Sequence, residues 1–314
     1  GVFFFCQSPF PLHYRNAFFI EEVDPPLGFG YLNRTDAYGW DGDENHLGFN
    51  QLRKNIIAGF GQDKPFERKF ELITKNKRLK LPGFMFSLSS HETQVAPKDG
   101  MELFKLLNPA AGLISAYDIW KYTKNEKDEE KRFLDNIYEF ENSSSILILD
   151  SGNYEAFRKN DRFSTDNKKG WSNEKFREIA TMISPDIAFS YDEPEPEGEI
   201  SKIADRVIKN YNQDKDAIGI EDITLCPIIH LPKDIIHSSK RNNKKIADLA
   251  SQLAIKVTSE LKPLMIAIPE RELGGGLIER VKTVRKIRQA LNSLGKYYPL
   301  HLLGTGNPIT MKAL

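Results

Sequence analysis

The sequence has few cysteines, no net charge and no long apolar run. Its 314 residues include only Cys6 and Cys226, too few for a cysteine-rich zinc site or a disulfide framework. An intracellular, cytoplasmic location is therefore expected. Lys plus Arg and Asp plus Glu both number 44, so the overall charge gives no basic nucleic-acid footprint. No apolar run approaches the roughly 20 residues of a membrane span, and no membrane partner is expected.

Short apolar runs that alternate with amphipathic stretches dominate the chain from residue 83 onward. Hydrophobic residues make up 40% of the sequence, enough for a large core. The runs predict strands at 83–90, 112–117, 145–150, 186–191, 225–230, 264–269 and 300–303. Apolar residues at helical spacing predict helices over 99–106, 200–211, 246–261 and 277–291. Strands that alternate with helices indicate a parallel α/β sheet.

Seven strands are compatible with an open doubly wound sheet or with a (β/α)₈ TIM-like barrel. Polar residues follow almost every predicted strand: His91, Asp118, Asp150, Asp192, His230 and Glu270. A barrel collects its site from many strand ends, whereas a doubly wound sheet concentrates it at one point, so the barrel is favoured. The eighth strand would follow Leu314, or the run at residues 2–6 would supply it.

The first 82 residues do not follow this alternation and are expected to form an N-terminal extension. Residues 66–74 and 78–81 predict an antiparallel hairpin with its turn at 75–77, packed on the barrel. Residues 26–64 are rich in Gly, Asp and Asn and predict a long excursion. The expected domains are therefore 1–82, the extension with its hairpin, and 83–314, the barrel.

The strand end at residues 145–154 carries the most specific chemistry. A buried apolar run ends in Asp150, Ser151, Gly152 and Tyr154. Asp150 supplies a charge or a base, Gly152 lets backbone approach a ligand, and Tyr154 offers a flat face. Asp192 ends the next strand, and a carboxylate accepts two N–H donors side by side. These residues predict a pocket for a flat polar heterocycle, although either aspartate could instead cap a helix.

Three further strand ends give weaker signals. His230 is either a ligand-binding residue or a core histidine whose hydrogen bonds are all made within the protein. Glu270 could meet a substrate amine, and the glycines at 274–276 either expose backbone amides or form a loop. Gly304, in the Gly-x-Gly turn at 304–306, could expose backbone N–H groups to a phosphate. The basic cluster at 280–288 could meet a nucleic-acid backbone, but solvated faces are the commoner use of such clusters.

Four motifs in this order resemble the tRNA-guanine transglycosylase superfamily, and within it the DNA-modifying DpdA-like branch. They lie at residues 83–89 (GFMFSLS), 148–155 (ILDSGNYE), 184–193 (SPDIAFSYDE) and 301–308 (HLLGTGNP). The resemblance covers roughly residues 66–314. It implies a (β/α)₈ barrel that exchanges guanine for a 7-deazaguanine in DNA or tRNA.

The resemblance also implies roles for individual residues. Asp150 matches the aspartate at the reaction centre, and Asp192 matches the carboxylate that reads the N–H edge of the purine. Ser151 and Gly152 match the polar floor of the pocket. The base would stack between Tyr154 and Leu303, and His230 stands where the family often has a glutamine that binds the base.

The sequence departs from the family in three ways. The family's nucleophilic aspartate and its three-Cys, one-His zinc site follow the last motif, and residues 1–314 contain neither pattern, so no cofactor is predicted. Residues 269–271 (PER) replace the family's glycine-leucine turn. Enzymatic activity is therefore left open.

Three functions follow as alternatives. The first is base exchange in nucleic acid. The second is a binding module that recognises a 7-deazaguanine, free or on a partner protein, in a pathway such as anti-phage defence. The third is a metal-assisted hydrolase with His91, Asp118, Asp150, Asp192 and His230 as ligands.

Overall fold

The computed structural model describes residues 71–74, 77–90, 95–123, 128–157, 170–219, 223–237 and 243–306. Contacts divide the chain into two units, residues 1–63 with 306–314 and residues 64–305, and nearly all described residues belong to the second. The predicted strand at 2–6, the excursion at 26–64 and His91 lie outside the described residues. The predicted domain boundary near residue 82 stays a prediction.

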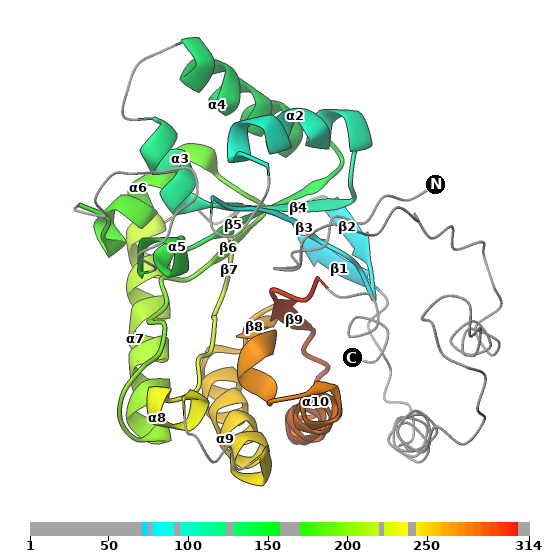
Figure 1. Ribbon diagram of the computed structural model, residues 1–314, viewed down its shortest axis with the longest axis vertical. Helices are drawn as coiled ribbons and strands as arrows, with labels where there is room; N and C mark the ends of the chain where they lie inside the picture. The colour runs from blue at the N-terminus through cyan, green and yellow to red at the C-terminus, as the bar shows by residue number, and fades with distance from the viewer. Residues whose placement is uncertain are drawn as a thin grey trace, which may run out of the picture. The chain divides into compact units, whose positions relative to one another are not determined.

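All seven predicted parallel strands are present (Figure 1). Their bounds are β3 Phe86–Leu88, β4 Ala111–Ser115, β5 Ile146–Asp150, β6 Ile187–Phe189, β7 Thr224–Cys226, β8 Ile266–Pro269 and β9 Leu300–Leu303. Strands β3 to β7 pair in sequence order as one parallel sheet, and β8 pairs in parallel with β9. A single parallel bridge, Ile228 to Ala267, joins the two sheets. The predicted α/β class is confirmed, but a closed eight-stranded barrel is not shown by the described residues.

The helices lie between the strands in the chain, as predicted. They are α2 Pro97–Leu107, α3 Ala116–Tyr122, α4 Asp128–Glu141, α5 Asn153–Phe157, α6 Asn173–Ile183, α7 Ile200–Ile218, α8 Lys233–Ile236, α9 Asn243–Leu261 and α10 Leu277–Asn292. Local sequence sets some of their ends. The Ser172 side chain accepts a hydrogen bond from the backbone N–H of Lys175 at the start of α6, and α7 ends at the left-handed Gly219. No helix among these described elements is long and apolar enough to cross a membrane.

Strand β5 shows why the predicted runs are continuously apolar. Leu147 and Leu149 face the helices and pack in a cluster that includes Ile137 of α4. Ile146 and Ile148, which alternate with them, belong to a second cluster on the opposite face of the sheet. All four are fully buried. Because side chains alternate along a strand, burial on both faces requires an uninterrupted apolar run.

The second cluster, here called the inner cluster, joins side chains from both sheets and from the hairpin. It includes Ile148 of β5, Phe189 of β6 and Ala267 of β8, together with the free thiol of Cys226. The predicted hairpin is confirmed as β1 Glu71–Thr74 paired antiparallel with β2 Lys77–Lys80. Leu72 and Leu79 place the hairpin in the same cluster, so it packs against the inner face of the strands.

A buried ion pair fixes the hairpin at the amino ends of the strands. The Nζ atom of Lys77 lies 2.8 Å from Oδ2 of Asp186, which directly precedes β6 and is fully buried. The same carboxylate oxygen accepts a hydrogen bond from the backbone N–H of Leu147 at 2.8 Å. The predicted site residues follow the opposite, carboxyl ends of the strands, so the hairpin and the site occupy opposite ends of the sheet.

Candidate functional site

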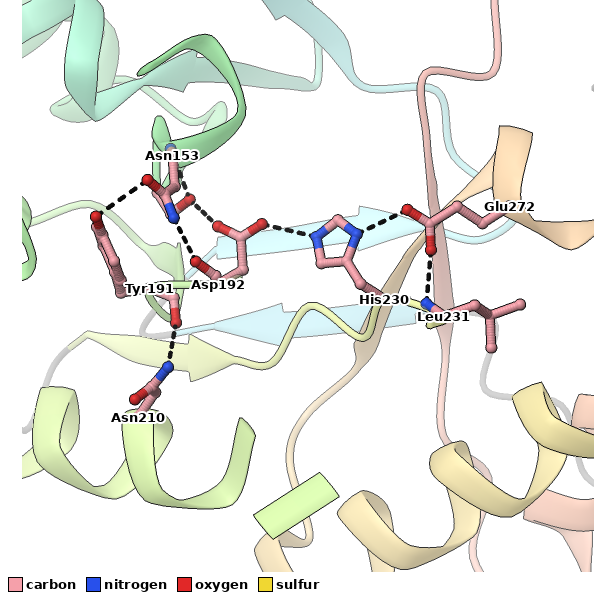
Figure 2. A network of polar contacts seen from close by, with 8 residues as sticks. Asn153, Tyr191, Asp192, Asn210, His230, Leu231 and Glu272 are labelled. Carbon is pink, nitrogen blue, oxygen red and sulfur yellow. Dashed lines mark hydrogen bonds and ion pairs between the residues drawn. The ribbon is translucent and has the colours of Figure 1, made fainter. Parts of the chain in front are cut away.

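The polar residues after β5, β6 and β7 meet at one edge of the sheet, as expected for parallel strands. Asp150 is the last residue of β5 and stands opposite Ser115 of β4. Asp192 follows β6 by three residues, and His230 follows β7 by four. Asp192 and His230 come together in the structure, and Glu272, which was not predicted, joins them (Figure 2). Asp150 lies within electrostatic range of Asp192.

The turn after Asp150 has a conformation that favours glycine at its centre. Gly152 has a φ of +71°, in the left-handed region, and α5 begins directly after it. A Cβ atom on Gly152 would lie 2.4 Å from the backbone nitrogen of Tyr117 and 2.9 Å from Oγ of Ser115. The close approach of this turn to the end of β4 therefore requires the absence of a side chain.

Two hydrogen-bonded side chains join the β5 turn to the loop after β6 (Figure 2). The hydroxyl of Ser151 donates to Oδ1 of Asp192 and accepts from the backbone N–H of Asn153 at 3.1 Å. The Asn153 amide donates to the backbone carbonyl of Asp192 at 2.5 Å, and the Tyr191 hydroxyl donates to Oδ1 of Asn153 at 3.0 Å. The position of Asp192 is therefore fixed through both its side chain and its backbone.

His230 lies between two carboxylates. Its Nε2 atom is 2.7 Å from Oδ2 of Asp192, and its Nδ1 atom is 2.8 Å from Oε1 of Glu272. The other oxygen of Glu272 accepts from the backbone N–H of Leu231 at 2.7 Å. Asp192, His230 and Glu272 are only 7%, 4% and 3% exposed. Burial opposes charge on the ring, but the two carboxylates together raise the pKa of His230 to about 10.

Three further carboxyl groups continue from Asp192: Asp150 and Glu155 interact with it, and Asp118 interacts with Glu155. Burial first, and then the charges of Glu155 and Asp192, raise the pKa of Asp150 well above its ordinary value, against hydrogen bonds from the backbone of Gly152 and Ser151. Burial also raises the pKa of Glu155, whose Oε1 atom accepts from the Ser89 hydroxyl at 2.6 Å. These two groups therefore hold protons more tightly than free carboxyls do.

Asp118 is the third of these carboxyl groups. It is fully buried at the start of α3 and accepts a hydrogen bond from the backbone N–H of Ser90 at 2.7 Å. Burial and the neighbouring Glu155 raise its pKa to about 7. In the parts of the chain that the structure describes, no three His, Cys, Asp or Glu side chains are arranged to hold a metal ion.

Tyr154 lies beside this network, and its ring is covered on one side by Arg271. The guanidinium carbon of Arg271 is 4.2 Å from the centre of the Tyr154 ring, and the guanidinium also donates to the Tyr154 hydroxyl. Arg271 belongs to the short 3₁₀ helix η4, Glu270–Leu273, which directly follows β8. The two residues are 117 positions apart, so sequence patterns gave no sign of the contact.

The remaining predicted residues occupy the edge of the same region. Glu270 is buried, and its carboxylate pairs with Arg280 of α10. Leu303 ends β9 opposite Pro269 and packs against the inner cluster, and Gly304 follows it with a φ of +76°. The roles predicted for these three residues stay predictions.

A small crevice adjoins the network on the side of α7. Asp192, His230, Ile203 and Arg206 are among its lining residues. Its free space is about that of one water molecule. It is too small for a heterocycle.

Glu155 and Glu272 were not predicted as site residues. Glu155 follows the Asp150 turn within the motif at 148–155, and its proximity to a strand end was the signal that could have identified it. Glu272 lies two residues beyond Glu270, which was predicted in its place. Comparison of the sequence with protein-family models and with curated proteins gives no match in either case. Support for a function therefore comes from the motifs and from the geometry of the site.

Proposed function

We propose that this protein binds a guanine-type base at the carboxyl ends of β5 and β6 and exchanges it for a 7-deazaguanine in DNA or tRNA. One observation carries the proposal. Asp150 and Asp192, predicted from separate motifs to act on one base, lie within electrostatic range of each other and are joined through the Ser151 turn. The order of the four motifs supports the same conclusion.

The Asp192 carboxylate has acceptor positions left that could bind the N–H edge of a purine. Each of its oxygens takes part in one hydrogen bond, with Ser151 or with His230. A carboxylate oxygen can accept a second hydrogen bond, so two lone pairs are left for two N–H donors. The ring N–H and exocyclic amine of guanine form such a pair of donors. Tyr154 would stack on one face of the base and Leu303 would close the other.

Asp150 would transfer a proton. Exchange breaks the bond between the sugar C1′ and the ring nitrogen of the leaving guanine, which leaves with a proton. The nucleophilic aspartate that the resemblance implies, and that residues 1–314 do not contain, would bond to C1′ in its place. The incoming base would then displace that aspartate from C1′ and give a proton back. Because burial raises its pKa well above the ordinary value, Asp150 would hold a proton more tightly than a free carboxyl does, and it would take the proton back after the exchange.

We also propose that the strands close into the eight-stranded barrel that the motifs predict. The inner cluster supports this, because it already joins side chains from β4, β5, β6 and β8, and Leu303 of β9 packs against it. The ring of Phe189 in β6 also lies 5.3 Å from that of His301 in β9, across the inner face. An eighth strand would complete the barrel between β9 and β3.

Binding of free bases tests the role of Asp192. The Asp192→Asn variant should bind guanine and 7-deazaguanines about 10- to 100-fold more weakly, because the amide turns a donor toward groups that all donate. Isothermal titration calorimetry measures this, with Asp205→Asn as the control. Asp205 is exposed on α7, where it pairs with Lys256 at 2.6 Å, and its variant should bind as the wild type does. Unchanged binding in Asp192→Asn would contradict the proposal, as would a wild type that binds no base.

Incorporation of labelled guanine into tRNA and DNA separates the enzyme from the binding module. Exchange in either polymer supports the enzyme. Binding of the base without exchange in either polymer, measured with the full-length protein, would favour the alternative of a module that recognises a 7-deazaguanine on a partner.

Arg271 should compete with the base for Tyr154. Replacing Arg271 with alanine is expected to raise the affinity for guanine about 2- to 5-fold, because a cation–π contact of about 0.5–1 kcal/mol no longer has to be broken. Arg288→Ala is the matched control, since Arg288 lies 4.5 Å from the Tyr297 ring in an equivalent contact on α10. A lower affinity in Arg271→Ala would instead mean that Arg271 contacts the ligand.

A further inference from the structure

Glu272 contacts both the side chain of His230 and the backbone that follows it (Figure 2). One oxygen lies 2.8 Å from Nδ1 of His230, and the other accepts from the backbone N–H of Leu231, the next residue in the chain. Glu272 is 3% exposed and therefore has little contact with water. Its carboxylate holds both the ring and the backbone of the loop after β7.

The geometry around His230 determines where its protons lie. A neutral imidazole has one donor nitrogen and one acceptor nitrogen. Both ring nitrogens of His230 face carboxylate oxygens within 2.8 Å, and an acceptor nitrogen there would set two lone pairs against each other. The two carboxylates also accept from Leu231 N–H and from the Ser151 hydroxyl. An arrangement in which both ring nitrogens donate, and the ring is positively charged, satisfies all of these contacts.

We infer that Glu272 is a positioning residue of the base site: it keeps His230 protonated on both nitrogens, and His230 in turn holds the Asp192 carboxylate in the orientation that the base requires. This inference rests on the proposed function for the identity of the ligand. The charged groups that face His230 are Asp192, from the loop after β6, and Glu272, from η4. An Asp192 that only accepts selects bases with two neighbouring N–H donors and rejects those that present an acceptor there.

The protonation of His230 can be measured without any ligand. In protein labelled with ¹⁵N at its six histidines, the His230 signal is assigned as the one lost in His230→Gln. Both of its nitrogens should show imidazolium shifts at about pH 7.5, well above the ordinary pKa of about 6.5. In Glu272→Gln, His230 should lose its proton at a pH lower by about two units. A wild-type His230 that is neutral at about pH 7.5 overturns the inference, even if the variant fails to fold.

Base binding then tests whether Glu272 acts through His230. Glu272→Gln should weaken guanine binding about 10-fold, while Glu260→Gln, on the exposed surface of α9, should leave it unchanged. In a His230→Gln background the Glu272→Gln change should have less than about a 2-fold effect, because the ring through which it acts is gone. An equal effect of Glu272→Gln in both backgrounds would overturn the inference and indicate a purely structural role.

The two proposals fail in different ways. A protein with a charged His230 that depends on Glu272, but with no affinity for any base, refutes the proposed function and leaves the arrangement of the three side chains established. A protein that binds guanine through Asp192, but whose His230 keeps its charge in Glu272→Gln, retains the proposed function and refutes the role of Glu272.

Discussion

Replacing Asp150 with asparagine is expected to reduce base exchange by about 10²- to 10⁴-fold, the usual loss when a general acid or base is removed. Asparagine keeps the shape of the side chain but carries no transferable proton. Incorporation of labelled guanine measures the loss. Guanine binding should change little, because in the proposed function Asp192 and not Asp150 would contact the edge of the base. Exchange in Asp150→Asn within about 2-fold of the wild type would contradict the role of Asp150.

The Asp150→Asn variant, which is expected to lose activity, should gain stability relative to the wild type as the pH rises. The pKa of Asp150 is raised in the folded protein, so folding favours its protonated form. The stability that this proton supplies is fully present below the pKa of the unfolded chain and is lost as the pH rises toward the folded-state pKa. The wild type should therefore lose stability between about pH 5 and about pH 8, whereas Asp150→Asn should not lose this contribution. In urea unfolding, the free energy of unfolding of the variant minus that of the wild type should be larger at about pH 8 than at about pH 5. Asp205→Asn, at an exposed position, should show no such difference.

The second large effect is expected from Gly152→Ala, which should reduce the free energy of unfolding by about 2–5 kcal/mol. The left-handed φ of +71° costs an L-residue about 1–2 kcal/mol. The new Cβ would also meet Tyr117 at 2.4 Å, where a backbone nitrogen cannot move aside, and overpacking of this kind costs about 1–3 kcal/mol. Urea unfolding measures the total.

Gly295→Ala is a matched control for Gly152→Ala. Gly295 has a φ of +72°, almost the same as Gly152, but nothing lies within 4 Å of the position of its Cβ. It should show only the conformational cost, and the difference between the two variants gives the cost of the close approach to β4. Equal losses in both variants would mean that the turn after β5 can move away from Tyr117.

The strands could be predicted from the sequence because their physical cause is local. A strand buried on both faces must be largely apolar, as β5 and β8 are. The proximity of Asp150 to Asp192, and of Asp192 to His230, followed from the same prediction, since the carboxyl ends of parallel strands share one edge. Closure of the sheet could not be settled in this way, because it depends on pairing between distant strands rather than on any one run.

The residues that sequence reasoning missed depend on geometry that apolar patterns do not encode. The chain after β8 turns into a 3₁₀ helix, with about three residues per turn. Glu270 and Glu272 therefore leave the helix on different sides, the first toward Arg280 and the second toward His230. Glu270, the acidic residue directly after the strand, was the natural prediction, but only the three-dimensional turn decides which of the two glutamates reaches the site.

The hairpin at the amino ends of the strands has a consequence for the order of events in base exchange. Leu72 and Leu79 fill the interior beneath the site, and Lys77 is fixed to the buried Asp186. A base held at the carboxyl ends would therefore enter and depart through the same opening. The outgoing purine would have to clear that opening before its replacement arrived. Free guanine would accordingly act as a competitor of the incoming base, and its removal would set the direction in which exchange proceeds.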